Sequence, residues 1–103
     1  EIKTMRKIVL LCAAGMSTSL LVNKMKEYAA SIGYEADIAA YPVAEAEQRG
    51  ADADVVLLGP QVKFSLKKVQ GIVKCPCEAI EMRAYGMMDG KAVVEFAKKL
   101  IGD

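Results

Sequence analysis

The chain has 103 residues, of which 53% are hydrophobic, and a formal net charge of +1. This length predicts one domain over residues 1–103. The near-zero charge and scarce aromatic residues argue against nucleic-acid binding, and the absence of histidine excludes phosphohistidine, a histidine base and histidine-containing metal sites on this chain. Its apolar runs are far shorter than the roughly 20 residues of a bilayer span, and an odd number of cysteines fits a reducing compartment, so we expect a cytosolic protein.

The first strand is predicted over about residues 7–12, where a continuous apolar run without alternation is typical of burial on both faces. A helix is predicted from about residue 17 to residue 31, and Gly33 is expected to close it in the left-handed conformation. The spacing of apolar residues predicts an inward stripe of Leu20, Leu21, Lys24, Met25, Tyr28 and Ala29, with Lys24 at its edge.

The second strand, at about residues 34–41, alternates between apolar and polar residues, as strands at a sheet edge do, and Pro42 ends it. A short helix over about residues 43–49 follows. The run Val55-Val56-Leu57-Leu58 then predicts another strand buried on both faces, which Gly59 and Pro60 end.

The third helix is predicted over about residues 61–73 and the fourth strand over about 77–82, where two glutamates interrupt the apolar run. A loop is expected at residues 86–90, with Asp89 as the cap of a last helix over about 91–101. One face of the third helix is expected to carry Val62, Leu66, Val69 and Val73.

Strands and helices therefore alternate along the whole chain, which favours parallel strands joined by right-handed crossovers. We predict an α/β fold with a four-stranded parallel sheet between two helix layers, flavodoxin-like in its winding and with strand order 2-1-3-4. Ligands of such sheets bind beyond the carboxyl ends of the strands, next to the first strand. Residues 12–19, 59–61 and 85–90 are expected at that edge.

The segment Cys12-Ala-Ala-Gly-Met-Ser-Thr-Ser19 joins the first strand to the first helix. Its small residues let a ligand approach the backbone, and its N–H groups together with the helix dipole favour a phosphoryl group and the thiolate form of Cys12. We therefore interpret Cys12 as a nucleophile that carries a phosphoryl group. The hydroxyl residues Ser17, Thr18 and Ser19 can instead act as caps of the helix.

Cysteine phosphatases share this spacing, because their loop reads C-x5-R followed by Ser or Thr. Here Thr18 occupies the arginine position, and the loop has no acidic residue. Hydrolysis needs charge stabilisation and a proton donor for the leaving group, so a phosphate relay fits better than a phosphatase or an arsenate reductase. A non-catalytic regulatory domain of the same fold is a third alternative.

The chain resembles the IIB component of the bacterial phosphoenolpyruvate-dependent sugar phosphotransferase system, in its lactose/cellobiose/diacetylchitobiose branch. The resemblance rests on residues 12–22, 53–61, 85–86 and 89–90, which follow the order of that family. It implies a phosphotransferase in which Cys12 accepts phosphate from a histidine of a IIA protein and passes it to a sugar that enters through a membrane IIC transporter. The sugar itself stays open, and no cofactor is implied.

The resemblance also implies which residues hold the phosphoryl oxygens. They are the backbone N–H groups of about Ala13, Ala14, Gly15, Met16 and Ser17, with hydroxyl groups from Ser17, Thr18 or Ser19.

Two further groups of residues suggest additional roles. Cys75 and Cys77 have the spacing of half a metal site, but no second pair accompanies them, so we expect Cys77 in the core and Cys75 in a turn. No metal is expected. Met16, Met87 and Met88 either form an adaptable rim for partners or cover the core beneath the loops.

Overall fold

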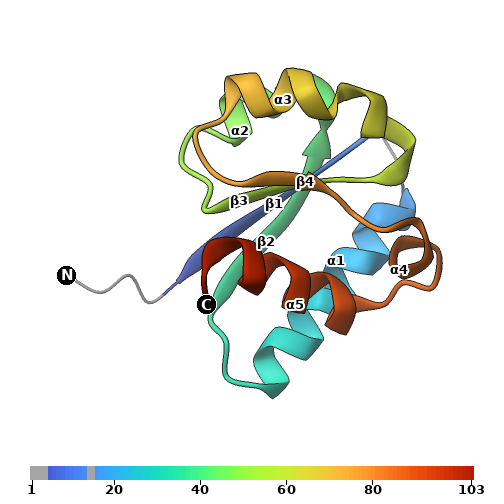
Figure 1. Cartoon of the computed structure of the whole chain (residues 1–103). Coiled ribbons are helices and arrows are strands. Elements are labelled where there is room, and N and C mark those ends of the chain that lie inside the picture. Colours follow the sequence, from blue (N-terminus) through green and yellow to red (C-terminus); the bar gives the residue numbers. More distant parts are fainter. Residues whose placement is uncertain (1–4, 14–15) are drawn as a thin grey trace.

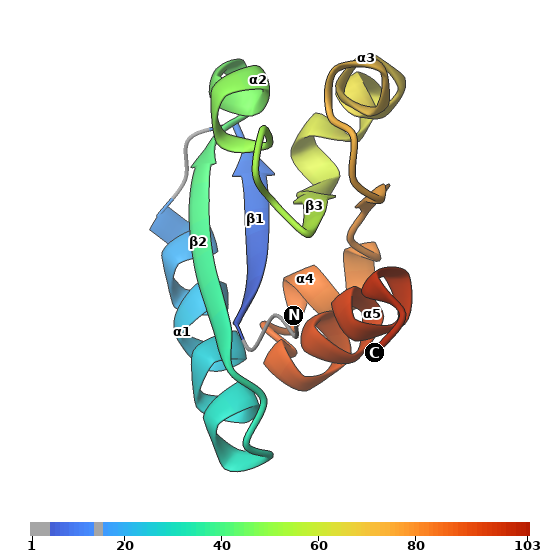
Figure 2. The same cartoon turned by 90° about the vertical axis from the view of Figure 1, so that its left-hand side faces the viewer.

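A computed structural model of the chain describes residues 5–13 and 16–103 and shows one parallel sheet between two helix layers (Figure 1). The strand order is β2-β1-β3-β4, which confirms the predicted fold, the order 2-1-3-4 and the place of the second strand at an edge. The arrowheads of β1 and β2 point the same way in Figure 2. The strands are β1 (Arg6–Cys12), β2 (Ala36–Pro42), β3 (Val55–Leu58) and β4 (Cys77–Ala79).

Helical segments connect these strands and follow the last of them. The α-helices are α1 (Met16–Ser31), α2 (Ala46–Arg49), α3 (Leu66–Ile72), α4 (Met82–Gly86) and α5 (Gly90–Ile101), and 3-10 helices at Val43–Glu45 and Pro60–Ser65 precede α2 and α3.

The two faces of the sheet are covered by different helices because side chains along a strand alternate between faces. Ile8 and Leu10 of β1 pack with α1 and α5, whereas Val9 and Leu11 pack with α2, α3 and the 3-10 helix before α3. Figure 1 shows α2 and α3 on one side of the strands and α1, α4 and α5 on the other. Residues Ile8 to Leu11 and all of β3 are buried, as predicted for central strands.

Two local predictions about the ends of helices are also confirmed. Gly33 has a φ of +70°, the left-handed conformation expected after α1. Asp89 caps α5, because its carboxylate oxygen accepts a hydrogen bond from the Ala92 N–H at 3.0 Å.

The inward stripe of α1 is predicted correctly except at one end. Leu21, Met25 and Ala29 are buried, but Leu20 is 49% exposed, so its predicted inward position is wrong. Val22 is buried in its place, because successive helix residues are rotated by about 100° and the buried face runs through positions 18, 21, 22, 25 and 29.

The helix predicted over residues 61–73 is wrong in its first half. That half is the 3-10 helix Pro60–Ser65, in which Val62 has non-helical φ and ψ values of −118° and 20°. This backbone lets Val62 turn its side chain into the core, where it is 2% exposed, directly after the strand-ending Gly59 and Pro60.

The fourth strand is shorter than predicted, and a helix that was not predicted follows it. β4 ends at Ala79, and α4 begins at Met82, inside the predicted strand, and runs into the predicted loop. The physical reason is packing, because Ile80, Ala84 and Tyr85 have helical spacing and are all buried in the core on the α1 and α5 side. Five helical residues are too few to give a clear periodic signal.

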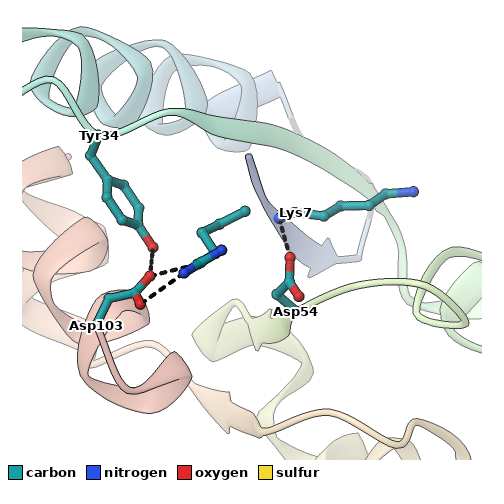
Figure 3. A network of polar contacts seen from close by, with 5 residues as sticks. Lys7, Tyr34, Asp54 and Asp103 are labelled. Atoms are coloured by element: carbon teal, nitrogen blue, oxygen red, sulfur yellow. Dashed lines mark hydrogen bonds and ion pairs between the residues drawn. The ribbon is translucent and has the colours of Figure 1, made fainter. Parts of the chain in front are cut away.

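A polar cluster joins the beginning of β1 to the end of the chain (Figure 3). The Asp103 carboxylate accepts a 2.7 Å bond from Arg6 Nε, a 3.2 Å bond from the same guanidinium and a 2.7 Å bond from the Tyr34 hydroxyl. These bonds, first that from Arg6 and then that from Tyr34, lower the pKa of Asp103 below its ordinary value. Nearby, the Lys7 N–H donates to Asp54 Oδ2 at 2.7 Å, which ties β1 to the turn before β3.

Replacing Asp103 by asparagine should destabilise the protein at neutral pH but not in acid. The folded-state pKa of Asp103 is lowered, so its stabilisation is complete above the unfolded pKa of about 4 and is lost as the pH falls through the folded pKa. Urea unfolding midpoints at pH 7 and at stepwise lower pH should therefore converge for Asp103→Asn and the parent protein. The matched control is Asp52→Asn. The Asp52 carboxylate pairs with Lys7, but the Asp52 side chain is 73% exposed, so this ion pair should contribute less to the free energy of unfolding. A constant difference at every pH would contradict this interpretation.

Candidate functional site

The carboxyl ends of the strands meet at one edge of the sheet, as predicted. Cys12, the last residue of β1, lies opposite Pro42 of β2. The Gly59 N–H donates to the Leu11 carbonyl at 2.9 Å, and the Ile80 N–H donates to the Leu58 carbonyl at 2.8 Å. These bonds join the end of β3 to β1 and the end of β4 to β3 at the edge where Cys12 lies.

Cys12 itself is held at this edge with little freedom. It is 7% exposed, and its thiol donates to the Tyr41 carbonyl oxygen with an S···O distance of 3.7 Å. Ala13 follows and is exposed. The predicted phosphate-binding residues Ala14 and Gly15 lie outside the described residues, and α1 begins directly after them at Met16. Three residues therefore separate the end of β1 from the start of α1.

The three hydroxyl residues lie inside α1, not before it. Ser17, Thr18 and Ser19 are its second, third and fourth residues, so the prediction that they act as N-terminal caps is wrong. α1 begins at Met16, one residue before the predicted start, and Thr18 belongs to its buried face. The backbone N–H groups of a first helical turn have no acceptor within the helix, so those of residues 16–19 can serve a ligand. The role of Ser17, Thr18 and Ser19 in phosphate binding stays a prediction.

The side chains of Thr18 and Ser19 have different surroundings. Ser19 is exposed, whereas Thr18 is 3% exposed and its Oγ1 lies 3.0 Å from the hydroxyl oxygen of Tyr85, a residue of α4 that is itself 5% exposed. The topology predicts Tyr85 at this edge of the sheet, but it does not predict the contact with Thr18. The available signal was the residue type, because a buried tyrosine normally finds a hydrogen-bond partner for its hydroxyl.

Tyr85 also adjoins the ends of the two central strands. A side-chain carbon placed on Gly59 would lie 3.1 Å from Gln61 Oε1, 3.7 Å from the Leu11 carbonyl oxygen and 3.9 Å from Cε2 of the Tyr85 ring. Residues 59–61 and 85 therefore lie together beside the end of β1, as predicted from the topology.

A groove opens next to Tyr85 at the same edge. Its volume is about 460 Å³, and its walls are mostly apolar. Met87 is 67% exposed, which fits the predicted role in an adaptable rim for partners. Met88 is half-buried and packs against the core, which fits the other predicted role, that of covering the core beneath the loops. The groove is lined by Pro60, Gln61, Met82, Tyr85, Gly86 and Met88.

The other two cysteines are unsuited to nucleophilic chemistry. Cys77 is buried in the core on the α2 and α3 side, as predicted, and burial raises its pKa to about 12. Cys75 lies half-buried in a bend, and burial raises its pKa too. Both therefore stay protonated at neutral pH, and a thiol is a far weaker nucleophile than a thiolate.

Comparison with known proteins gives consistent matches over nearly the whole chain. The family model described as "PTS system, Lactose/Cellobiose specific IIB subunit" matches residues 7–96. The oligo-beta-mannoside-specific EIIB component of Bacillus subtilis is 50% identical over 94% of this chain and 97% of its own length. The cellobiose-specific EIIB component of Lactococcus lactis is 43% identical over 91% and 94%.

Solved structures give the same result. The solution structure of a cellobiose-specific phosphotransferase IIB component from Borrelia burgdorferi has a TM-score of 0.80 and 37% identity, and the match covers 95% of this chain and 93% of that one. Across the part of the chain that the structure describes, no helix has the length and apolar character that crossing a membrane requires.

Proposed function

The chain belongs to the lactose/cellobiose-specific IIB family of the sugar phosphotransferase system, and from this membership we propose that it is a phosphocarrier whose carrier residue is Cys12. The observation that carries the proposal is the position of Cys12. It ends β1 at the carboxyl edge of the sheet, and the first turn of α1, with its N–H groups lacking helical acceptors, begins four residues later.

The proposed reaction consists of two displacements at phosphorus. In the first, the Cys12 thiolate attacks the phosphorus of a phosphohistidine on a IIA protein; an S–P bond forms, the P–N bond breaks, and the histidine leaves. In the second, a sugar hydroxyl attacks the phosphocysteine; an O–P bond forms, the S–P bond breaks, the thiolate returns, and the hydroxyl proton passes to a base or to water.

The proposed phosphate ligands are neutral. Backbone N–H groups of residues 13–17, with hydroxyls from Ser17, Thr18 or Ser19, would hold the phosphoryl oxygens. No arginine stands in the segment from Cys12 to Ser19, so phosphate is held without the bidentate charge that phosphatases use to stabilise the transition state. Weaker binding suits a phosphoryl group that must be transferred to the next acceptor.

The proposed partners are a IIA protein as donor and a membrane IIC transporter that delivers the sugar, which places the protein in the cytoplasm at the inner face of the membrane. We propose a disaccharide or a similar short oligosaccharide as the acceptor. The names of the oligo-beta-mannoside-specific and cellobiose-specific relatives support this class. They do not single out one sugar, because another relative of 43% identity is named for galactose, a monosaccharide.

Intact mass spectrometry tests the first displacement. The protein is incubated with phosphoenolpyruvate, the general phosphotransferase proteins and a IIA protein whose own phosphorylation is verified in the same reaction. We expect a gain of one phosphoryl group that is lost again when IIC-containing membranes and the cognate sugar are added. No gain with several competent IIA proteins, together with hydrolysis of a chromogenic phosphoester, would favour the cysteine phosphatase instead.

A further inference from the structure

Packing of the core does not by itself require the buried contact between Thr18 and Tyr85. Within residues 5–13 and 18–103, these two are the only buried residues that carry a hydroxyl group, and they are 67 positions apart in the chain. Burying a hydroxyl costs free energy unless it is hydrogen-bonded, and valine with phenylalanine would fill the same space without that cost. The pair therefore fixes a geometry more than it adds to the core.

The geometry that it fixes is that of the first turn of α1. Thr18 is the third residue of this helix, so its hydroxyl ties down the first turn, whose backbone N–H groups have no acceptor within the helix. Tyr85 is in turn anchored in α4, with its backbone N–H donating to the Glu81 carbonyl at 3.0 Å and its ring beside Gly59 at the end of β3. The bond thus joins the start of α1 to a second, independently held element.

We infer that Tyr85 is a positioning residue for phosphoryl transfer, acting through the Thr18 hydroxyl to hold the first turn of α1 against the end of β1. This inference rests on the proposed function. Donors that stabilise a transferring phosphoryl group work only when they are fixed in advance, and small misplacements cost much of the rate. Because both hydroxyls are buried, their loss should slow the transfer step and leave the docking of IIA unchanged.

The test compares the rate of phosphoryl gain from phosphorylated IIA, by rapid quench and intact mass, in single and double variants. We expect Tyr85→Phe and Thr18→Val each to lower the rate at saturating IIA about 10-fold, with an unchanged IIA concentration at half-maximal rate. The double variant should be no slower than the slower single variant, because both changes remove the same bond. Thr18→Ser, which keeps a hydroxyl at this position, should recover most of the rate.

The chain offers a matched control in Tyr28→Phe. The Tyr28 hydroxyl also ties α1 to another element, donating to Glu95 Oε2 of α5 at 2.6 Å. This bond is exposed to solvent, and Tyr28 is a half-buried residue in the second half of the helix. This variant should react at the parent rate. Urea unfolding of every variant shows whether a slow variant is also unfolded. If Thr18→Val is unstable, Tyr85→Phe, which keeps the aromatic ring, tests the inference.

Three outcomes would overturn the inference. One is a parent-like rate in Tyr85→Phe. Another is an equal loss in Tyr28→Phe. The third is a double variant about 100-fold slower, since independent effects multiply. A parent protein that gains no phosphoryl group at all overturns the proposed function, and the inference with it, so the two failures are distinguished in the same experiment.

Discussion

Replacing Cys12 by serine should reduce phosphoryl transfer at least about 1,000-fold while leaving the protein folded. A serine hydroxyl is almost never deprotonated at neutral pH, whereas a cysteine supplies a thiolate in useful amounts. The fold should tolerate the change, because the two side chains are similar in size and the serine hydroxyl can donate to the Tyr41 carbonyl that now accepts from the thiol. Intact mass after incubation with phosphorylated IIA measures the loss directly.

The other two cysteines provide the controls for this experiment. Cys75→Ser and Cys77→Ser should both still gain one phosphoryl group at nearly the parent rate. Cys77→Ser should lower the unfolding midpoint, because it places a hydroxyl among the buried side chains of the α2 and α3 side of the core, and the half-buried Cys75 should tolerate serine better. Full phosphorylation of Cys12→Ser, or loss of phosphorylation in a folded Cys75→Ser protein, would show that another residue carries the phosphoryl group.

Replacing Gly90 by alanine should destabilise the protein by about 2 to 3 kcal/mol. Gly90 is the first residue of α5, and a side-chain carbon there would lie 2.5 Å from the carbonyl carbon of Lys24, 2.6 Å from its oxygen and 2.7 Å from the Met25 nitrogen. These are backbone atoms of α1, so no side-chain rotation can relieve the overlap. The two helices must move apart, which loosens the core contacts that they share.

A second glycine makes the matched comparison. Gly71 lies inside α3, and a side-chain carbon added there meets no atom within 4 Å. Gly71→Ala should therefore stabilise the protein by about 0.5 to 1 kcal/mol, since alanine loses less backbone freedom on folding. Urea unfolding midpoints of both variants, at an unchanged slope, separate the steric effect from the entropic one. Equal shifts for Gly71→Ala and Gly90→Ala would contradict the close approach of α1 and α5.

The sequence by itself determined the sheet, its order and the place of the candidate nucleophile. The continuous apolar runs at residues 8–11 and 55–58 have no solvent face, so they can only be central strands covered on both sides. Helical connections between such strands leave few topologies, and all of them bring the last residue of the first strand to the carboxyl edge. That is why Cys12 was placed correctly without any knowledge of its neighbours.

Only the tertiary structure decided which side chains meet at that edge. The burial of Thr18 and Val22 with Leu20 exposed, the short helix α4 and the contact between Thr18 and Tyr85 all depend on elements far apart in the chain. The contact of Gly90 with the backbone of Lys24 is of the same kind. Periodicity reports how one segment faces the core as a whole, but it carries no information on which residue of another segment lies opposite, because that depends on the packing of complete helices against the sheet.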